Sequence, residues 1–232
     1  FALSGTVRTQ LAGTPVPNAV VELTSPTYSF LAQADANGDW TLPAVYADDY
    51  AYTAGAWGWV TGCGIINDLG VGSGPVELLL QQGYADDMAL DLGWTVSGDA
   101  TVGTWERGVP VGTTINNAQS NAGADVSGDC GDQAYVTGNG GGNAGDDDVD
   151  GGSTILTSPV FDATGVLQPH VRYKRWFFNG GGSGSPNDAM TIALSNGTQT
   201  VTVETITSAT PGMSSWQQGD VAIASFLAPT AT

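Results

Sequence analysis

Basic side chains are scarce in this sequence. Five Lys and Arg residues stand against twenty-three Asp and Glu residues, which gives a formal net charge of −18 over 232 residues. Binding to nucleic acid, or to the anionic face of a membrane, depends on clustered positive charge that this composition does not supply. No apolar run is long enough to span a bilayer either. The sequence therefore predicts no nucleic-acid partner and no membrane insertion.

Cysteine and histidine are almost as scarce. The chain has two cysteines, Cys63 and Cys130, and one histidine, His170. That set is too small for a Cys₄ or Cys₂His₂ zinc site. The two cysteines either form one disulfide in an oxidising compartment or remain separate as small buried hydrophobic residues. We expect them to be separate, because each falls in a different predicted domain.

Catalytic signatures are missing as well. A zinc carboxypeptidase needs two His and a Glu around its metal, and a Ser-His-Asp triad would have to use His170. His170 follows Pro169 at the start of a predicted strand, where a structural or surface role is the more common one. The acidic clusters lie in loops rather than flanking an aromatic cleft, which disfavours glycoside hydrolysis. We therefore expect a protein that is not an enzyme.

What the chain does contain is a series of short β-branched and aromatic runs, and no amphipathic helix, so the predicted fold class is all-β. Residues 1–82 hold seven such runs, which is typical of a β-sandwich. They cover residues 3–8, 19–23, 28–33, 40–43, 50–54, 57–60 and 75–80. A loop at 35–39 with Asn-Gly at its tip predicts a tight hairpin rather than a metal site, because no Glu follows at the EF-hand distance.

The motif order in residues 1–82, SGTV followed by PVPNAVVELT and ADANGDWTLPAV, resembles the carboxypeptidase regulatory-like domain. That resemblance implies a seven-stranded Ig/transthyretin-like sandwich. In the family, this domain is a non-catalytic attachment beside secreted peptidases and surface proteins. Residues 81–83 mark the junction to a second domain, 83–232, and are too short to act as a flexible linker.

The most acidic stretch of the second domain is a loop that opens into a predicted strand. Four carboxylates, Asp146, Asp147, Asp148 and Asp150, follow a glycine-rich approach and precede a β-branched run. Like charges this close repel one another, so the loop is either solvated or neutralised by a cation. Calcium is the natural candidate, because it takes six to eight oxygen ligands in flexible geometry. We expect a calcium site here.

Six motifs in residues 84–226, ALDLGW, TWERG, DVSGD, LTSPVFD, YKRWFF and NDAMTIALSNG, resemble the jelly-roll module at the C-terminal end of secreted Bacteroidetes-type zinc carboxypeptidases. They are more distantly similar to the MAM domain. The resemblance implies a jelly-roll β-sandwich with calcium bound at one edge. It also implies that the last strand is missing here or is supplied by another molecule. The metal ligands implied in this chain are Asp87, Asp91, Asp125, the 146–150 acids and, more weakly, Asp188.

Two groups of side chains have competing interpretations. Tyr50, Tyr52, Trp57 and Trp59 alternate on predicted strands, so they either stack sugars or, more commonly, fill a core or an interface. Trp94, Trp105 and Trp176 are expected in the core. On the predicted strand that begins at 170, Arg172 and Lys174 share one face, and Arg175 lies on the other with Tyr173. We expect an Arg of this strand to pair with an acidic loop.

These observations favour a non-catalytic, calcium-stabilised β-sandwich module of an extracellular or cell-surface bacterial protein. Its partners would be a parent peptidase domain or a cell-surface component, and its role would be adhesion or stability. A structural subunit of an extracellular filament or sheath, self-associating through exposed strand edges, is the alternative. A carbohydrate-binding module is a third hypothesis, because jelly rolls often bind sugars. Fold analogy alone does not choose among them.

Overall fold

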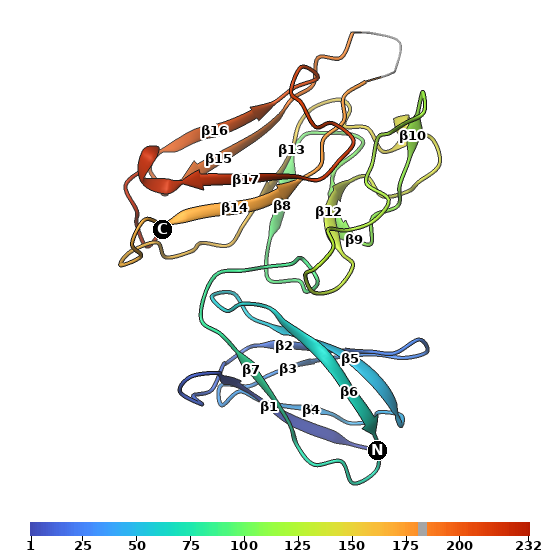
Figure 1. The fold of residues 1–232 in the computed structure, drawn as a ribbon, viewed down its shortest axis with the longest axis vertical. Helices are drawn as coiled ribbons and strands as arrows, with labels where there is room; N and C mark the ends of the chain where they lie inside the picture. The colour runs from blue at the N-terminus through green and yellow to red at the C-terminus, as the bar shows by residue number, and fades with distance from the viewer. Residues whose placement is uncertain (181–184) are drawn as a thin grey trace. The chain divides into compact units, whose positions relative to one another are not determined.

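The computed structural model describes residues 1–180 and 185–232, and these residues form an all-β protein, as expected (Figure 1). The described chain contains no α-helix, only two 3₁₀ turns at Ala144–Asp146 and Ile223–Ser225. No helix in this part of the chain is long and apolar enough to cross a membrane.

Two compact units make up the chain. Unit 1 consists of residues 1–93 together with 128–131, and unit 2 of residues 94–127 and 132–232. The sequence predicted one boundary, between residues 82 and 83, whereas the first unit extends to Gly93 and also takes in a short segment from further along the chain.

Unit 1 is a seven-stranded sandwich of two sheets, which matches the predicted number of strands. One sheet has three strands in the order β4-β1-β7 and the other has four in the order β3-β2-β5-β6. All neighbours are antiparallel except β1 and β7, which run parallel. The strands are β1 (Leu3–Thr9), β2 (Val20–Thr24), β3 (Ser29–Gln33), β4 (Asp39–Leu42), β5 (Asp48–Gly55), β6 (Gly62–Leu69) and β7 (Val76–Leu80).

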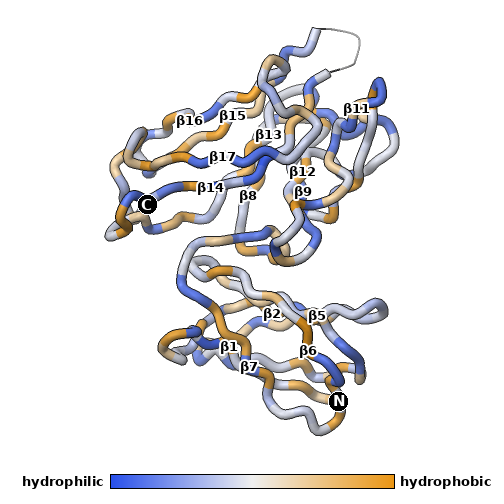
Figure 2. The backbone as a smooth tube through the Cα atoms, viewed as in Figure 1, coloured by the Kyte–Doolittle hydropathy of each residue, from blue (hydrophilic) through white to orange (hydrophobic). Residues whose placement is uncertain are grey.

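The core of unit 1 follows from the alternation of apolar residues along its strands. In β7, Leu78 and Leu80 are buried while Leu79 between them is 50% exposed, and Figure 2 shows this strand largely in the hydrophobic colour. Trp40 and Tyr50 are the largest fully buried side chains. The Trp40 indole lies against Gly5, where an added Cβ would come within 2.3 Å of it, so only glycine fits at that position.

The loop at 35–39 is a tight turn, but it does not join a hairpin. Its two flanking strands, β3 and β4, belong to different sheets, so the turn carries the chain from one layer of the sandwich to the other. The Asp35 carboxylate accepts hydrogen bonds from the backbone N–H groups of Asn37 and Asp39, at 2.7 and 3.0 Å. These bonds hold the pKa of Asp35 below its usual value, with the Asp39 bond the largest cause.

The predicted strand at 57–60 is wrong. Gly58 adopts φ +93°, and the Trp59 N–H donates to the carbonyl of Ala56, so the Trp57-Gly58-Trp59 segment is a turn. The strand that completes the sheet is β6, which the sequence pattern did not predict. Its Gly64 leaves room for the Tyr52 ring of β5, because a Cβ there would lie 2.7 Å from that ring. Glycines and polar residues weaken the alternating pattern that identifies strands.

Unit 2 is built from antiparallel pairs. The pairs are β8 (Thr95–Gly98) with β13 (Thr154–Thr157), β9 (Trp105–Gly108) with β12 (Ala134–Thr137), β10 (Thr114–Ile115) with β11 (Ala118–Gln119), β14 (His170–Arg175) with β17 (Gln217–Ala222), and β15 (Met190–Ser195) with β16 (Thr200–Ile206). Trp94, Trp105 and Trp176, expected in the core, are half-buried instead. The Trp176 indole N–H donates to the Ser120 carbonyl at 2.6 Å.

Candidate functional site

The two cysteines form a disulfide, Cys63–Cys130, which contradicts the expectation that they are separate. The expectation failed because residues 128–131, which lie within the sequence of the predicted second domain, are part of unit 1 in the structure. Cys63 lies on β6, and its Cα is 5.8 Å from that of Cys130, a separation typical of disulfides. Cys130 is 7% exposed, so the segment that carries it is packed and not merely tethered.

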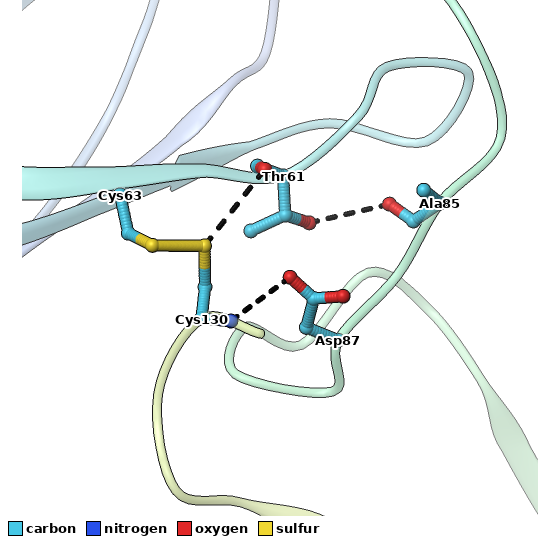
Figure 3. Close-up of a disulfide and its surroundings, with 5 residues drawn as sticks. All are labelled: Thr61, Cys63, Ala85, Asp87 and Cys130. Carbon is cyan, nitrogen blue, oxygen red and sulfur yellow. Dashed lines mark hydrogen bonds between the residues drawn. A yellow bond between two sulfur atoms is a disulfide. The ribbon is translucent and has the colours of Figure 1, made fainter. Parts of the chain in front are cut away.

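Two hydrogen bonds beside the disulfide hold the Cys130 segment and the chain around Asp87 in place (Figure 3). The Asp87 carboxylate accepts a hydrogen bond from the Cys130 N–H at 3.1 Å. Burial raises the pKa of Asp87, and the negative charges of Asp129 and Asp86 raise it further, while the bond from Cys130 opposes them. The Thr61 hydroxyl donates to the Ala85 carbonyl at 3.3 Å, which fixes the chain just before Asp87. Asp87, predicted as a metal ligand, therefore positions the disulfide loop.

The acids predicted as calcium ligands belong to both units. Asp87 and Asp91 lie in unit 1, and the other six in unit 2. Asp91 accepts from the Gly93 N–H at 3.1 Å, two residues on, and so closes a local turn. Asp125 accepts from the N–H of the adjacent residue, Val126, at 2.6 Å. Asp146 is exposed at the end of the first 3₁₀ turn.

Asp147 is the buried acid of the loop, 4% exposed. Its two carboxylate oxygens accept the backbone N–H groups of Gly140 and Gly141, each at 3.0 Å. The glycine-rich approach wraps around this side chain: Gly138 has φ +62°, and a Cβ there would lie 2.8 Å from the Asp147 Cα. Successive amides that form such a cradle bind anions. Here the cradle is filled by a carboxylate of the chain itself, so the loop is a folded element held by Asp147.

The charges of two other predicted ligands, Asp150 and Asp188, act on the Asp148 carboxyl group. Burial raises the pKa of Asp148, and the charges of Asp150 and Asp188 raise it further, against the opposing hydrogen bond from the Val149 N–H. Even so, in residues 1–180 and 185–232 no three or more His, Cys, Asp or Glu side chains are grouped closely enough to hold a metal ion. The eight predicted ligands are not assembled around one point in the described residues, and calcium binding by them stays a prediction.

The side chains of the basic strand β14 lie on the two faces that the sequence predicted. His170, Arg172 and Lys174 point to one face and are exposed. They pair with β17, because His170 Nδ1 and Arg172 Nε contact the two Asp220 oxygens at 2.5 and 2.9 Å. The hydrogen bond from His170, followed by that from Arg172, holds the pKa of Asp220 below its usual value. Arg172 thus pairs with an acidic residue of a neighbouring strand and not with an acidic loop.

On the opposite face of β14, Arg175 and Tyr173 both contact Glu204 of β16. Arg175 binds it through two nitrogens, at 2.5 and 3.2 Å, and the Tyr173 hydroxyl donates to it at 2.5 Å. A register shift in the β15–β16 pair places Val203 and Glu204 consecutively on the more buried side, which is what a β-bulge does. The bulge therefore lets one carboxylate link the β14–β17 and β15–β16 pairs.

No protein-family model and no curated protein matches this chain. Two solved structures show limited similarity. A cohesin–X-dockerin complex from Acetivibrio cellulolyticus, described as an N-terminal interface mutant of a type II complex, is 22% identical with a TM-score of 0.26, covering 38% of this chain and 60% of that one. A DUF3823 family protein from Parabacteroides merdae is 12% identical with a TM-score of 0.28, covering 67% of this chain and 79% of that one.

Proposed function

We propose that this chain is a non-catalytic extracellular β-sandwich module of a secreted or surface bacterial protein, serving adhesion or stability. The observation that carries the proposal is the Cys63–Cys130 disulfide. Disulfides persist in oxidising compartments and are rare in a reducing cytosol. The excess of acidic residues fits a soluble surface exposed outside the cell.

The environment of His170 supports a non-catalytic role. The imidazole lies in an exposed cross-strand pairing with Asp220 and Arg172. The residues that contact it there supply no hydroxyl or thiol nucleophile, which a triad would require. The finer assignments, to a carboxypeptidase regulatory-like domain followed by a MAM-like jelly roll appended to a metallocarboxypeptidase, belong to this proposal and rest on the motif order alone.

The redox state of the protein in its own source tests the proposal. Cells and surrounding medium are quenched with acid, free thiols are alkylated with a mass-tagged reagent, and the protein is analysed before and after reduction. We expect the protein on the surface or in the medium, with no tagged thiol before reduction and two after it. A protein found in the cytosol with two free thiols would overturn the proposal.

Calcium stays part of the proposal at the Asp148, Asp150 and Asp188 group. These side chains as they lie are not grouped closely enough to share an ion, so a divalent cation would have to draw them together, and it would relieve the repulsion that Asp150 and Asp188 exert on Asp148. Thermal melts in calcium and in excess chelator test this. A cation that binds only the folded protein stabilises it by about 2.7 kcal/mol at a hundredfold excess over its dissociation constant. The matched variant is Asp188→Asn, which should reduce the calcium effect. Identical melts in both buffers would mean that these acids are simply solvated.

A filament or sheath subunit is the alternative, favoured by the edges of the four-stranded sheet. Its two edge strands, β3 and β6, carry exposed apolar side chains, Leu31 at 66% and Ile65 at 70%. Edge strands of this kind pair with other chains unless something protects them. Light scattering over a concentration series tests the alternative: growth to linear assemblies that Ile65→Lys abolishes would favour it, and a monodisperse monomer would exclude it.

A further inference from the structure

Unit 1 contains an open groove at one end of the four-stranded sheet. It measures about 360 Å³ and is lined by Pro17, Asn18, Val20, Gln33, Ala56, Trp57, Asp91 and Leu92. All of these residues belong to unit 1. They meet there because Val20, at the start of β2, pairs with Gln33 at the end of β3 and with Gly55 at the end of β5. The volume lies at the lower end of the range for small-ligand sites, about 300–1,000 Å³.

Trp57 supplies an aromatic surface beside the groove. The two indoles of the turn that follows β5 have different surroundings. Trp59 packs against the hydrophobic core of unit 1, whereas Trp57 is not among the residues that pack against this core. Trp57 is half-buried and lies 5.5 Å, ring centre to ring centre, from Tyr84, whose side chain is 47% exposed. An aromatic pair at the surface and away from the core supplies an apolar body with a polar edge.

The polar groups around the groove are of the kind that bind hydroxyl groups. The Asn18 and Gln33 side chains are exposed and make no hydrogen bond to the described part of the chain. Each amide both donates and accepts. Asp91 uses one carboxylate oxygen for the Gly93 N–H, and a carboxylate has further acceptor capacity.

The backbone that holds these groups is well fixed. Leu92 lies over Gly55, where an added Cβ would come within 3.8 Å of it, and Leu90 would lie closer still, at 3.1 Å. Leu90 is 3% exposed, so the segment that carries Asp91 is anchored in unit 1. Asn18 adopts φ +59°, and its N–H donates to the Ala34 carbonyl at 3.2 Å, which anchors the loop on the opposite side.

We infer that this groove binds a neutral saccharide, with Trp57 stacking on a sugar ring and Asn18, Gln33 and Asp91 bonding to its hydroxyl groups. An aromatic surface with convergent amide and carboxylate groups suits a ligand that has apolar ring faces and polyhydroxylated edges. Charge excludes the acidic polysaccharides, because the chain carries −18 and the groove itself contains a carboxylate. The site goes beyond the proposed function, and it lies in unit 1 rather than in the predicted jelly roll.

Affinity electrophoresis of the intact chain, in gels that contain neutral β-glucan, xylan, galactomannan or glycogen, tests the inference. We expect at least one polysaccharide to retard the protein, and calorimetry with a hexasaccharide of that polymer to give its Kd. Trp57→Ala should raise the Kd about tenfold, which equals about 1.4 kcal/mol. Gln33→Ala, an exposed change at a strand end, should raise it several-fold without disturbing the fold. Tyr46→Ala is the control, because Tyr46 is 60% exposed and stacked on Tyr28 but does not line the groove.

The inference is overturned if none of the four gels retards the protein. It is also overturned if the Gln33→Ala variant and the Trp57→Ala variant each bind with the same Kd as the wild type. Retardation only by an anionic polysaccharide would also overturn it. Circular dichroism of each variant separates a lost contact from a lost fold, and Gln33→Ala keeps the test decisive if Trp57→Ala does not fold. None of these outcomes bears on the thiol-labelling experiment, so the failure of one proposal is distinguishable from the failure of the other.

Discussion

Removing the Cys63–Cys130 disulfide should destabilise unit 1 strongly. The two cysteines are 67 residues apart in sequence. The disulfide changes the conformational entropy of the denatured chain by about −2.1 − 1.5R ln n, where n is the number of residues in the closed loop. This loss is roughly 15 cal/mol/K here, which stabilises the folded state by about 4 kcal/mol at 25 °C. If unit 2 stays folded while unit 1 unfolds, residues 94–127 are already ordered, and the flexible loop shortens to about 35 residues. Because the dependence is logarithmic, the result is still about 4 kcal/mol.

Urea denaturation of the wild type and of the Cys63→Ser/Cys130→Ser variant measures this quantity. With a slope of about 2 kcal/mol/M, the midpoint for unit 1 should fall by about 2 M. Two controls accompany it: wild type in reductant should match the variant, and reductant should not change the variant. A variant within about 1 kcal/mol of oxidised wild type would refute the reasoning, because it would mean that the denatured chain gains little freedom when the bond is absent.

Three further predictions concern individual carboxylates. Asp147→Ala should lower the free energy of unfolding by about 2–4 kcal/mol, because the backbone N–H groups of Gly140 and Gly141 lose their charged acceptor. The exposed neighbour change Asp146→Ala should leave urea midpoints unchanged, and equal effects of the two changes would contradict the structural role of Asp147. Glu204→Ala should cost about 3 kcal/mol, because Arg175, 11% exposed, loses its partner. The hydrogen bond from Arg175 holds the pKa of Glu204 below its usual value of 4.5. In thermal melts, the wild type should therefore lose the stability that this ion pair contributes as pH falls below 4.5, whereas the Glu204→Ala variant has no such contribution to lose. Asp87→Asn should be neutral or stabilising at pH 7, since burial raises the pKa of the acid, whereas Asp87→Ala should cost about 1 kcal/mol; the opposite order in calorimetry would contradict this.

The parts of the fold that the sequence predicted are those with local causes. Alternation identified six of the seven strands of unit 1 and placed Arg172 and Lys174 on the face opposite to Arg175. The missed strand, β6, contains Gly62, Gly64, Asn67 and Asp68, which obscure the period of two.

What local patterns did not predict was long-range pairing. The excursion that brings Cys130 to Cys63 crosses the predicted domain boundary, so spacing argued for separate thiols. The role of Asp147 depends on amides six and seven residues earlier that curl around it. In the sequence it is indistinguishable from Asp146 and Asp148, and only the three-dimensional path of the glycine-rich loop distinguishes them.

The return of residues 128–131 to unit 1 has a consequence for the order in which the chain is made. A chain synthesised or translocated from its N-terminus presents all seven strands of unit 1 before Cys130 emerges, so Cys63 must wait through about fifty residues that follow β7. During that interval the Cys63 thiol is available to oxidants and to other thiols. A protease cut in residues 94–127 would likewise leave two fragments that separate only after reduction. The disulfide of unit 1 therefore forms only after all seven of its strands are available to fold. No single cut between 94 and 127 releases unit 1 intact, because residues 128–131 would stay with the other fragment.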